Sequence, residues 1–114
     1  MALALNVFQT IAQVVQNVED EVYTAPVGYT GVVLLAQVTN TGAQSHDITL
    51  IHRRDIGGGT EIDTPMLQAY PIPASDTLNM LSGKLVLESG DKLVMFSSDP
   101  SEVHTVISIL ETLN

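Results

Sequence analysis

The chain has 114 residues, the length of one ordinary domain. Hydrophobic residues make up 45% of it and charged residues only 15%, against about 25% in an average globular domain, so we expect apolar surface that is buried between subunits. The formal net charge of −9 argues against nucleic acid or a membrane surface as a partner, and the lack of cysteine excludes disulfides and thiolate chemistry.

Residues 1–18 carry two patterns. The high content of Val, Gln and Thr favours a strand, which is our prediction. A helix is the alternative, because five apolar residues have helical spacing: Phe8, Ile11, Val15, Val18 and Val22. The segment then either belongs to the folded domain or forms an arm that completes a sheet edge of a neighbour. No run approaches the roughly 18 apolar residues of a membrane span, and residues 1–5 lack the basic start of a secretory signal.

From residue 23 onward, strand and turn patterns alternate at short intervals. The turn at 24–28 leads into residues 32–38, a β-branched run that predicts a buried central strand. Residues 47–53 alternate between two faces, which predicts a second strand. Three consecutive glycines at 57–59 predict an exposed loop tip, because ordering them inside an element costs too much conformational entropy.

The second half of the chain contains prolines and then further strands. Pro65, Pro71 and Pro73 each remove a ladder donor, so their segment is predicted to be an edge strand or a crossing connection. Residues 85–96 predict a hairpin with a tight turn in its middle. Residues 103–110 alternate with apolar side chains on both faces, so we expect this strand to be covered on each side. The whole pattern predicts an all-β fold: one antiparallel β-sandwich over residues 1–114, jelly-roll-like, with about eight short strands.

No group of residues has the spacing of a catalytic or metal site. His46, His52 and His104 lie far apart in sequence, although strand pairing could bring His52 near His104. The carboxylates stand mostly at turns, where they satisfy backbone donors, and the basic cluster 52–54 is interpreted as a solvated strand end. The glycines at 57–59 lack the Lys of a phosphate-binding loop. We therefore expect no catalytic residue, no cofactor and no metal ligand, in a protein that is not an enzyme.

Three stretches go beyond a general strand pattern: residues 23–40 (YTAPVGYTGVVLLAQVTN), 72–91 (IPASDTLNMLSGKLVLESGD) and 108–111 (SILE). Together they resemble small virion structural proteins of tailed bacteriophages, including marine phages and those of cyanobacteria. The resemblance implies a β-sandwich present in many copies on the head, neck, tail or baseplate, and it transfers no active site.

We therefore expect an oligomeric capsid decoration or cement protein, or a small neck, tail or baseplate component, located in the virion. Its expected partners are copies of itself, a trimer among the options, and capsid, neck or tail subunits, with contacts through strand faces and through loops such as 57–60 and 97–102. The alternative is a receptor- or carbohydrate-binding module of a phage fibre, for which Tyr23, Tyr29 and Tyr70 are the only tyrosines. A small hydrolase or metal enzyme of cupin-like shape would need clustered histidines and carboxylates that the sequence does not show.

Overall fold

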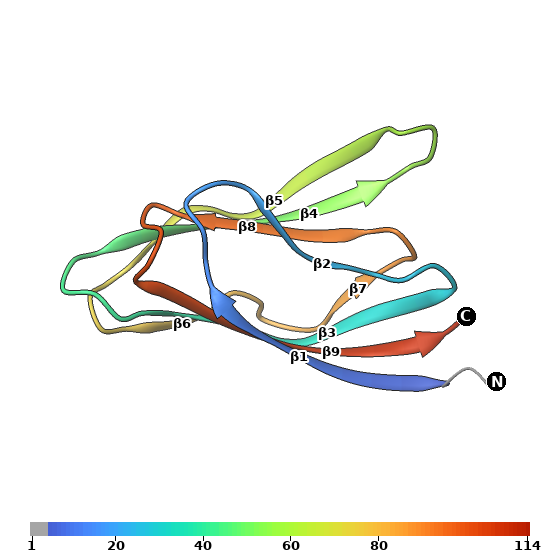
Figure 1. Cartoon of the computed structure of the whole chain (residues 1–114), viewed down its shortest axis with the longest axis horizontal. Helices are drawn as coiled ribbons and strands as arrows, with labels where there is room; N and C mark the ends of the chain where they lie inside the picture. Colours follow the sequence, from blue (N-terminus) through green and yellow to red (C-terminus); the bar gives the residue numbers. More distant parts are fainter. Residues whose placement is uncertain (1–4) are drawn as a thin grey trace.

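The structure is a computed structural model that describes residues 5–114, and every regular element within them is a β-strand (Figure 1). The strands are β1 (Asn6–Val14), β2 (Asp20–Thr24), β3 (Tyr29–Asn40), β4 (His46–Asp55), β5 (Glu61–Ile72), β6 (Thr77–Asn79), β7 (Leu85–Leu87), β8 (Lys92–Ser97) and β9 (Val103–Leu113). Within residues 5–114 there is no helix of the length and apolarity needed to cross a membrane.

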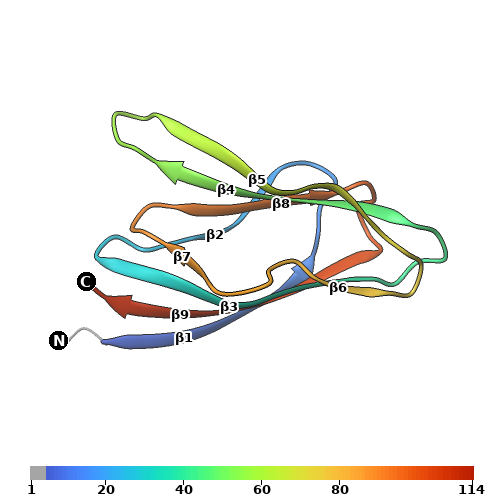
Figure 2. The same cartoon turned by 180° about the vertical axis from the view of Figure 1, so that it is seen from behind.

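The strands form two antiparallel sheets that pack face to face (Figures 1 and 2). One sheet has the order β1-β9-β3-β6, with β7 also paired to β3, and the other has the order β2-β8-β4-β5. Both β6 and β7 lie on the side of β3 opposite β9, so they occupy one strand position in two pieces. The chain thus fills four positions in each sheet, and it changes sheet at most connections. This is the jelly-roll arrangement, and it confirms the predicted β-sandwich.

The core lies between the two sheets and is built by strict alternation. On β9, every second residue from Val103 to Ile109 points inward with at most 1% exposure, Thr105 among them, while His104, Val106 and Ser108 between them are more exposed. From the other sheet, Leu93 and Met95 of β8 meet them, both fully buried. A period of two residues places every second side chain of a strand on the same face, so each strand can contribute to the core with apolar residues on one face alone.

Residues 6–14 form β1 at the edge of the first sheet, so the predicted strand is confirmed over these residues and the helical alternative is wrong. They pair with β9 along their whole length, so this part of the segment belongs to the sandwich. Residues 1–4 of the predicted strand or arm lie outside the residues that the structure describes. The prolines of residues 61–72 stand on β5, an edge strand, as one of the two alternatives proposed.

The predicted hairpin at 85–96 is wrong. Its two strands belong to different sheets, since β7 pairs with β3 while β8 pairs with β2 and β4. The turn between them bonds to a third segment: the Gly90 N–H donates to the Ala25 carbonyl, and the Ala25 N–H donates to the Asp91 carbonyl, both at 2.9 Å. These bonds, with the left-handed backbone of Gly90 (φ 88°), direct the chain across the sandwich instead of back along the same sheet.

Candidate functional site

The outer face of the β2-β8-β4-β5 sheet carries a group of ion pairs around Arg53. This residue of β4 reaches Glu19 (2.9 Å), Glu21 (3.2 Å) and Asp63 (2.7 Å). The carboxylates raise the pKa of Arg53, with Asp63 contributing most, and Arg53 in turn lowers the pKa of Asp63 through its hydrogen bond. The side chain of Arg53 is only 15% exposed, so the interpretation of the basic cluster as a solvated strand end is wrong at this position.

Two further basic residues on this sheet are paired in the same manner. Lys92 of β8 contacts Glu61 (2.8 Å) and Glu21 (3.3 Å), and Arg54 contacts Glu88 (2.6 Å). Arg53 and Lys92 therefore pair with carboxylates on this outer face, while Arg54 pairs with Glu88, which follows β7. A partner that docks on this face would have to displace several ion pairs.

The outer face of the opposite sheet, by contrast, has no charged side chain on its strands β1, β3 and β9 and carries a row of apolar ones. Among the residues of β1, β3 and β9, the one side chain with a formal charge at pH 7 is Glu111, and it points inward with 4% exposure. The cross-strand register places four apolar side chains in one row over this face: Phe8, Leu110, Val32 and Val86. Phe8 is 75% exposed and Val86 is 55% exposed.

More apolar side chains extend this row over the same face. Val106 on β9 is 40% exposed, and Leu34 and Leu35 at the bulge of β3 are 39% and 37% exposed. We expected residues 103–110 to be covered on both sides, and one chain covers only their inner side. Contiguous apolar surface of this kind marks an interaction site in soluble proteins, so we take this sheet face as the candidate functional surface.

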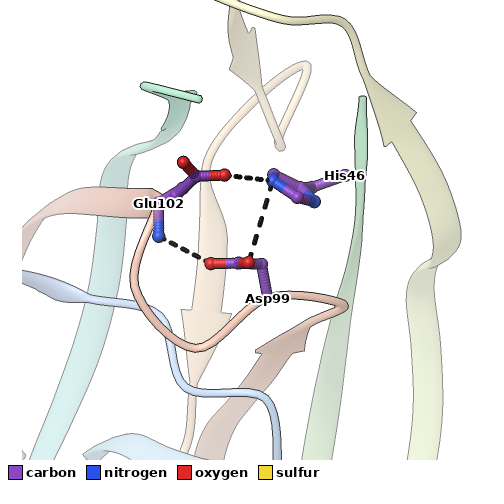
Figure 3. A group of neighbouring side chains, drawn as sticks. All are labelled: His46, Asp99 and Glu102. Carbon is purple, nitrogen blue, oxygen red and sulfur yellow. Dashed lines mark hydrogen bonds and ion pairs between the residues drawn. The ribbon is translucent and has the colours of Figure 1, made fainter. Parts of the chain in front are cut away.

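A polar cluster stands at one end of the sandwich (Figure 3). The Nε2 atom of His46, at the start of β4, lies 2.7 Å from Glu102 Oε1 and 4.0 Å from Asp99 Oδ2. Asp99 is fixed by its own loop, because its Oδ1 accepts the N–H groups of Ser101 and Glu102, and these bonds lower its pKa. Gly42 leaves the space that the Glu102 carboxylate fills.

This cluster has the groups to bind a cation, and it also holds the loop at 97–102 in place. One imidazole nitrogen and two carboxylates lie within 4.8 Å of one another, a ligand set that a divalent cation can use. The hydrogen bond from His46 to Glu102 also ties the loop at 97–102 to β4 without any ion. Sequence reasoning considered His46 and the acids separately and expected no metal ligand. Only the jelly-roll topology brings residues 46 and 102 together.

The other histidines do not meet. His52 points into the sandwich, where its Nε2 lies 3.4 Å from Oδ2 of the buried Asp91, while His104 is exposed on the outer face of the first sheet. The suggested approach of His52 and His104 is therefore wrong, since they stand in different sheets.

The three tyrosines do not form one aromatic surface. Tyr23 is 7% exposed and donates a 2.5 Å hydrogen bond to Glu111, whose other oxygen accepts from Gln9 at 2.7 Å. Tyr29 pairs in register with Leu113 at one end of the first sheet, and Tyr70 stands on the edge strand β5 of the second. The loop at 57–60 is exposed, with all three glycines in the left-handed region, and in both views it lies at the projecting tip of β4 and β5 (Figures 1 and 2).

No protein-family model matches the sequence, and no curated protein is significantly similar to it. Two solved structures share the fold. A chain of the T13 viral particle of IBDV matches with a TM-score of 0.59 and 13% identity over 97% of this chain and 32% of that one. A subunit of the disulfide-linked pili of Bacillus endospore appendages matches with a TM-score of 0.54 and 10% identity over 100% of this chain and 97% of that one.

These likenesses bear on the fold alone, and the present chain spans about a third of the viral chain that it matches. Both neighbours nevertheless belong to repeating assemblies, one a viral particle and the other a pilus. The disulfide link of the pili has no counterpart here, because this sequence contains no cysteine.

Proposed function

We propose that this chain is a non-enzymatic structural protein of a virion, a building block that assembles with copies of itself and with neighbouring virion proteins. The observation that carries the proposal is the uncharged outer face of β1, β9 and β3, with its row of exposed apolar side chains, in a chain of net charge −9. Apolar area on one sheet and ion pairs on the other give the sandwich one face for contacts and one for water. The jelly-roll fold, shared with a viral particle protein, supports the same proposal.

Within the virion, we assign the chain to a tailed bacteriophage, as a decoration or cement protein or as a small neck, tail or baseplate component. The support for this finer assignment is the resemblance of residues 23–40, 72–91 and 108–111 to such proteins. The loop at 97–102 is fastened by His46 and Asp99, so it presents a fixed shape to a neighbour.

The test is the presence of the chain in assembled particles. Antibodies against the purified protein should label particles from the same source at regular positions in electron micrographs, and the protein should sediment with them. Absence of the protein from particles, together with a strictly monomeric mass in solution, would refute the proposal.

The alternative proposal is a receptor- or carbohydrate-binding module of a phage fibre. With Tyr23 buried, it rests on Tyr70, which is 47% exposed on β5. Binding on a glycan array that is lost in Tyr70→Ala but kept in Val27→Ala, a change at an exposed apolar residue elsewhere, would favour it over the structural proposal.

A further inference from the structure

Each sheet of an open sandwich ends in two edge strands with unpaired backbone groups. Here the edges are β1 and the divided position β6/β7 in one sheet, and β2 and β5 in the other. Free edges invite pairing with another chain, so natural proteins protect them with prolines, charges, bulges or short strands. An edge that lacks these devices is a candidate for strand addition.

Three of the four edges are protected. The β5 edge carries Pro65 and Pro71, which lack N–H donors, and the left-handed backbone of Ala69 (φ 45°). The β2 edge is five residues long and bulged between Glu21 and Tyr23. At the fourth position of the first sheet, β6 and β7 have three residues each.

The β1 edge has none of these protections. Its nine residues, NVFQTIAQV, contain no proline, glycine or charged residue. They pair with β9 in unbroken register from Asn6 opposite Thr112 to Val14 opposite His104, with no bulge. Phe8 stands 75% exposed on this strand, at the outer end of the apolar row. The strand has the composition of an interior strand, yet it lies at an edge.

We propose that β1 of one copy pairs antiparallel with β1 of a second copy across a two-fold axis, which joins the two sheets into one. This inference rests on the proposed function and names its partner, a second copy of the same chain. The charge distribution supports that partner, because copies of net charge −9 repel one another and β1 is a segment where they can meet without opposing carboxylates.

The protected edges also decide the symmetry. A head-to-tail contact of β1 with β5, β2 or β6/β7 of another copy would meet prolines, a bulge or an interrupted ladder. The one uninterrupted partner that the described residues offer for β1 is β1 itself. Such an isologous contact closes on itself, so the unit is a dimer and not a filament or a ring of three.

The expected strength follows from the size of the contact. Nine residues at about 3.4 Å each give a seam roughly 30 Å long, which at about 10 Å depth buries roughly 300 Å² per copy. A stable interface buries about 800 Å² per partner, so the dimer alone should be weak and should depend on concentration. Contacts with the rest of a particle would then hold it in place.

The test is sedimentation equilibrium of the full chain over a wide concentration range. The wild-type protein should pass from monomer to dimer, and Thr10→Lys should weaken dimerisation on the order of tenfold by placing like charges close to the two-fold axis. Thr10 is exposed, so the fold should tolerate the change, and circular dichroism checks this. Phe8→Glu is a second variant at the same edge.

Gln37→Lys is the matched control, since it adds the same charge to the same sheet on β3, separated from the β1 edge by β9. Dimerisation that is weakened on the order of tenfold in Thr10→Lys, weakened in Phe8→Glu and unchanged in Gln37→Lys supports the pairing. A trimer or larger ring that resists Thr10→Lys overturns the pairing and leaves the proposed function standing. A wild-type monomer at every concentration also overturns it, and particle labelling then judges the proposed function separately.

Discussion

Removal of one buried hydroxyl should destabilise the sandwich measurably. Tyr23 of β2 donates to Glu111 of β9 across the core, and Gln9 supplies a second hydrogen bond to the same carboxylate. In Tyr23→Phe, one carboxylate oxygen would lose its donor in a place where water is excluded. A hydrogen bond to a charged group contributes about 1.5 to 3 kcal/mol, so we expect the free energy of unfolding to fall by about 2 kcal/mol.

The assay is thermal unfolding followed by circular dichroism. For a domain of this size, about 2 kcal/mol corresponds to a Tm lower by roughly 8 °C. Tyr70→Phe is the control, because Tyr70 is 47% exposed and surface changes of this kind usually stay within about 0.5 kcal/mol. If Tyr23→Phe and Tyr70→Phe melt at the same temperature, the hydrogen bond to Glu111 does not stabilise the fold and the reasoning is refuted.

The same contact predicts a pH dependence. Burial, and then the hydrogen bond to Glu111, raise the pKa of Tyr23 above its ordinary value of 10.0. The folded chain therefore holds this proton more tightly than the unfolded chain, so its contribution is complete below pH 10 and is lost as the pH rises further. Wild type should lose stability above pH 10 more steeply than Tyr23→Phe, and parallel curves for the two proteins would contradict this.

Two further predictions concern packing and charge. Gly31→Ala should destabilise the fold, because the new Cβ would stand 2.9 Å from the Tyr23 hydroxyl, whereas Gly83→Ala, with no atom within 4 Å, should be neutral in the same thermal melts. Arg53→Gln should lower the urea concentration at the unfolding midpoint at neutral pH. Because Arg53 lowers the pKa of Asp63 below its ordinary 3.8, the difference in midpoint from wild type should shrink as the pH falls below that value. A difference that stays constant with pH would exclude the Arg53–Asp63 pair as its source.

The fold was predictable because its strands carry a local signal. The alternation on residues 47–53 and 103–110 follows from burial on one face, and both segments lie within strands, β4 and β9. The hairpin at 85–96 failed because a tight turn has the same local sequence whether the chain returns along one sheet or crosses to the other. The bonds between residues 90–91 and Ala25 make that choice, and they join segments about 65 positions apart.

The candidate surface and the polar cluster were harder to predict, because both depend on which strands become neighbours. The approach of His46 to Glu102 spans 56 positions and has no local spacing to reveal it. Arg53 looked like a solvated strand end because its partners come from elsewhere: Glu21 stands on β2 and Asp63 on β5. The sequence predicted cover on both faces of residues 103–110, and in the single chain their outer face stays open.

Pairing of two copies through the β1 edge would also enlarge the outer face of the first sheet. A strand of 11 residues at about 3.3 Å each, in a sheet four strands wide at about 4.8 Å spacing, presents roughly 700 Å² on its outer face. That is slightly below the roughly 800 Å² per partner of a standard interface. Pairing through β1 would place two such faces side by side with Phe8 from each copy near the seam, about 1,400 Å² of surface in all. The unprotected edge would thereby turn two marginal docking faces into one of ample size, while the ion-paired sheets of both copies stay in water.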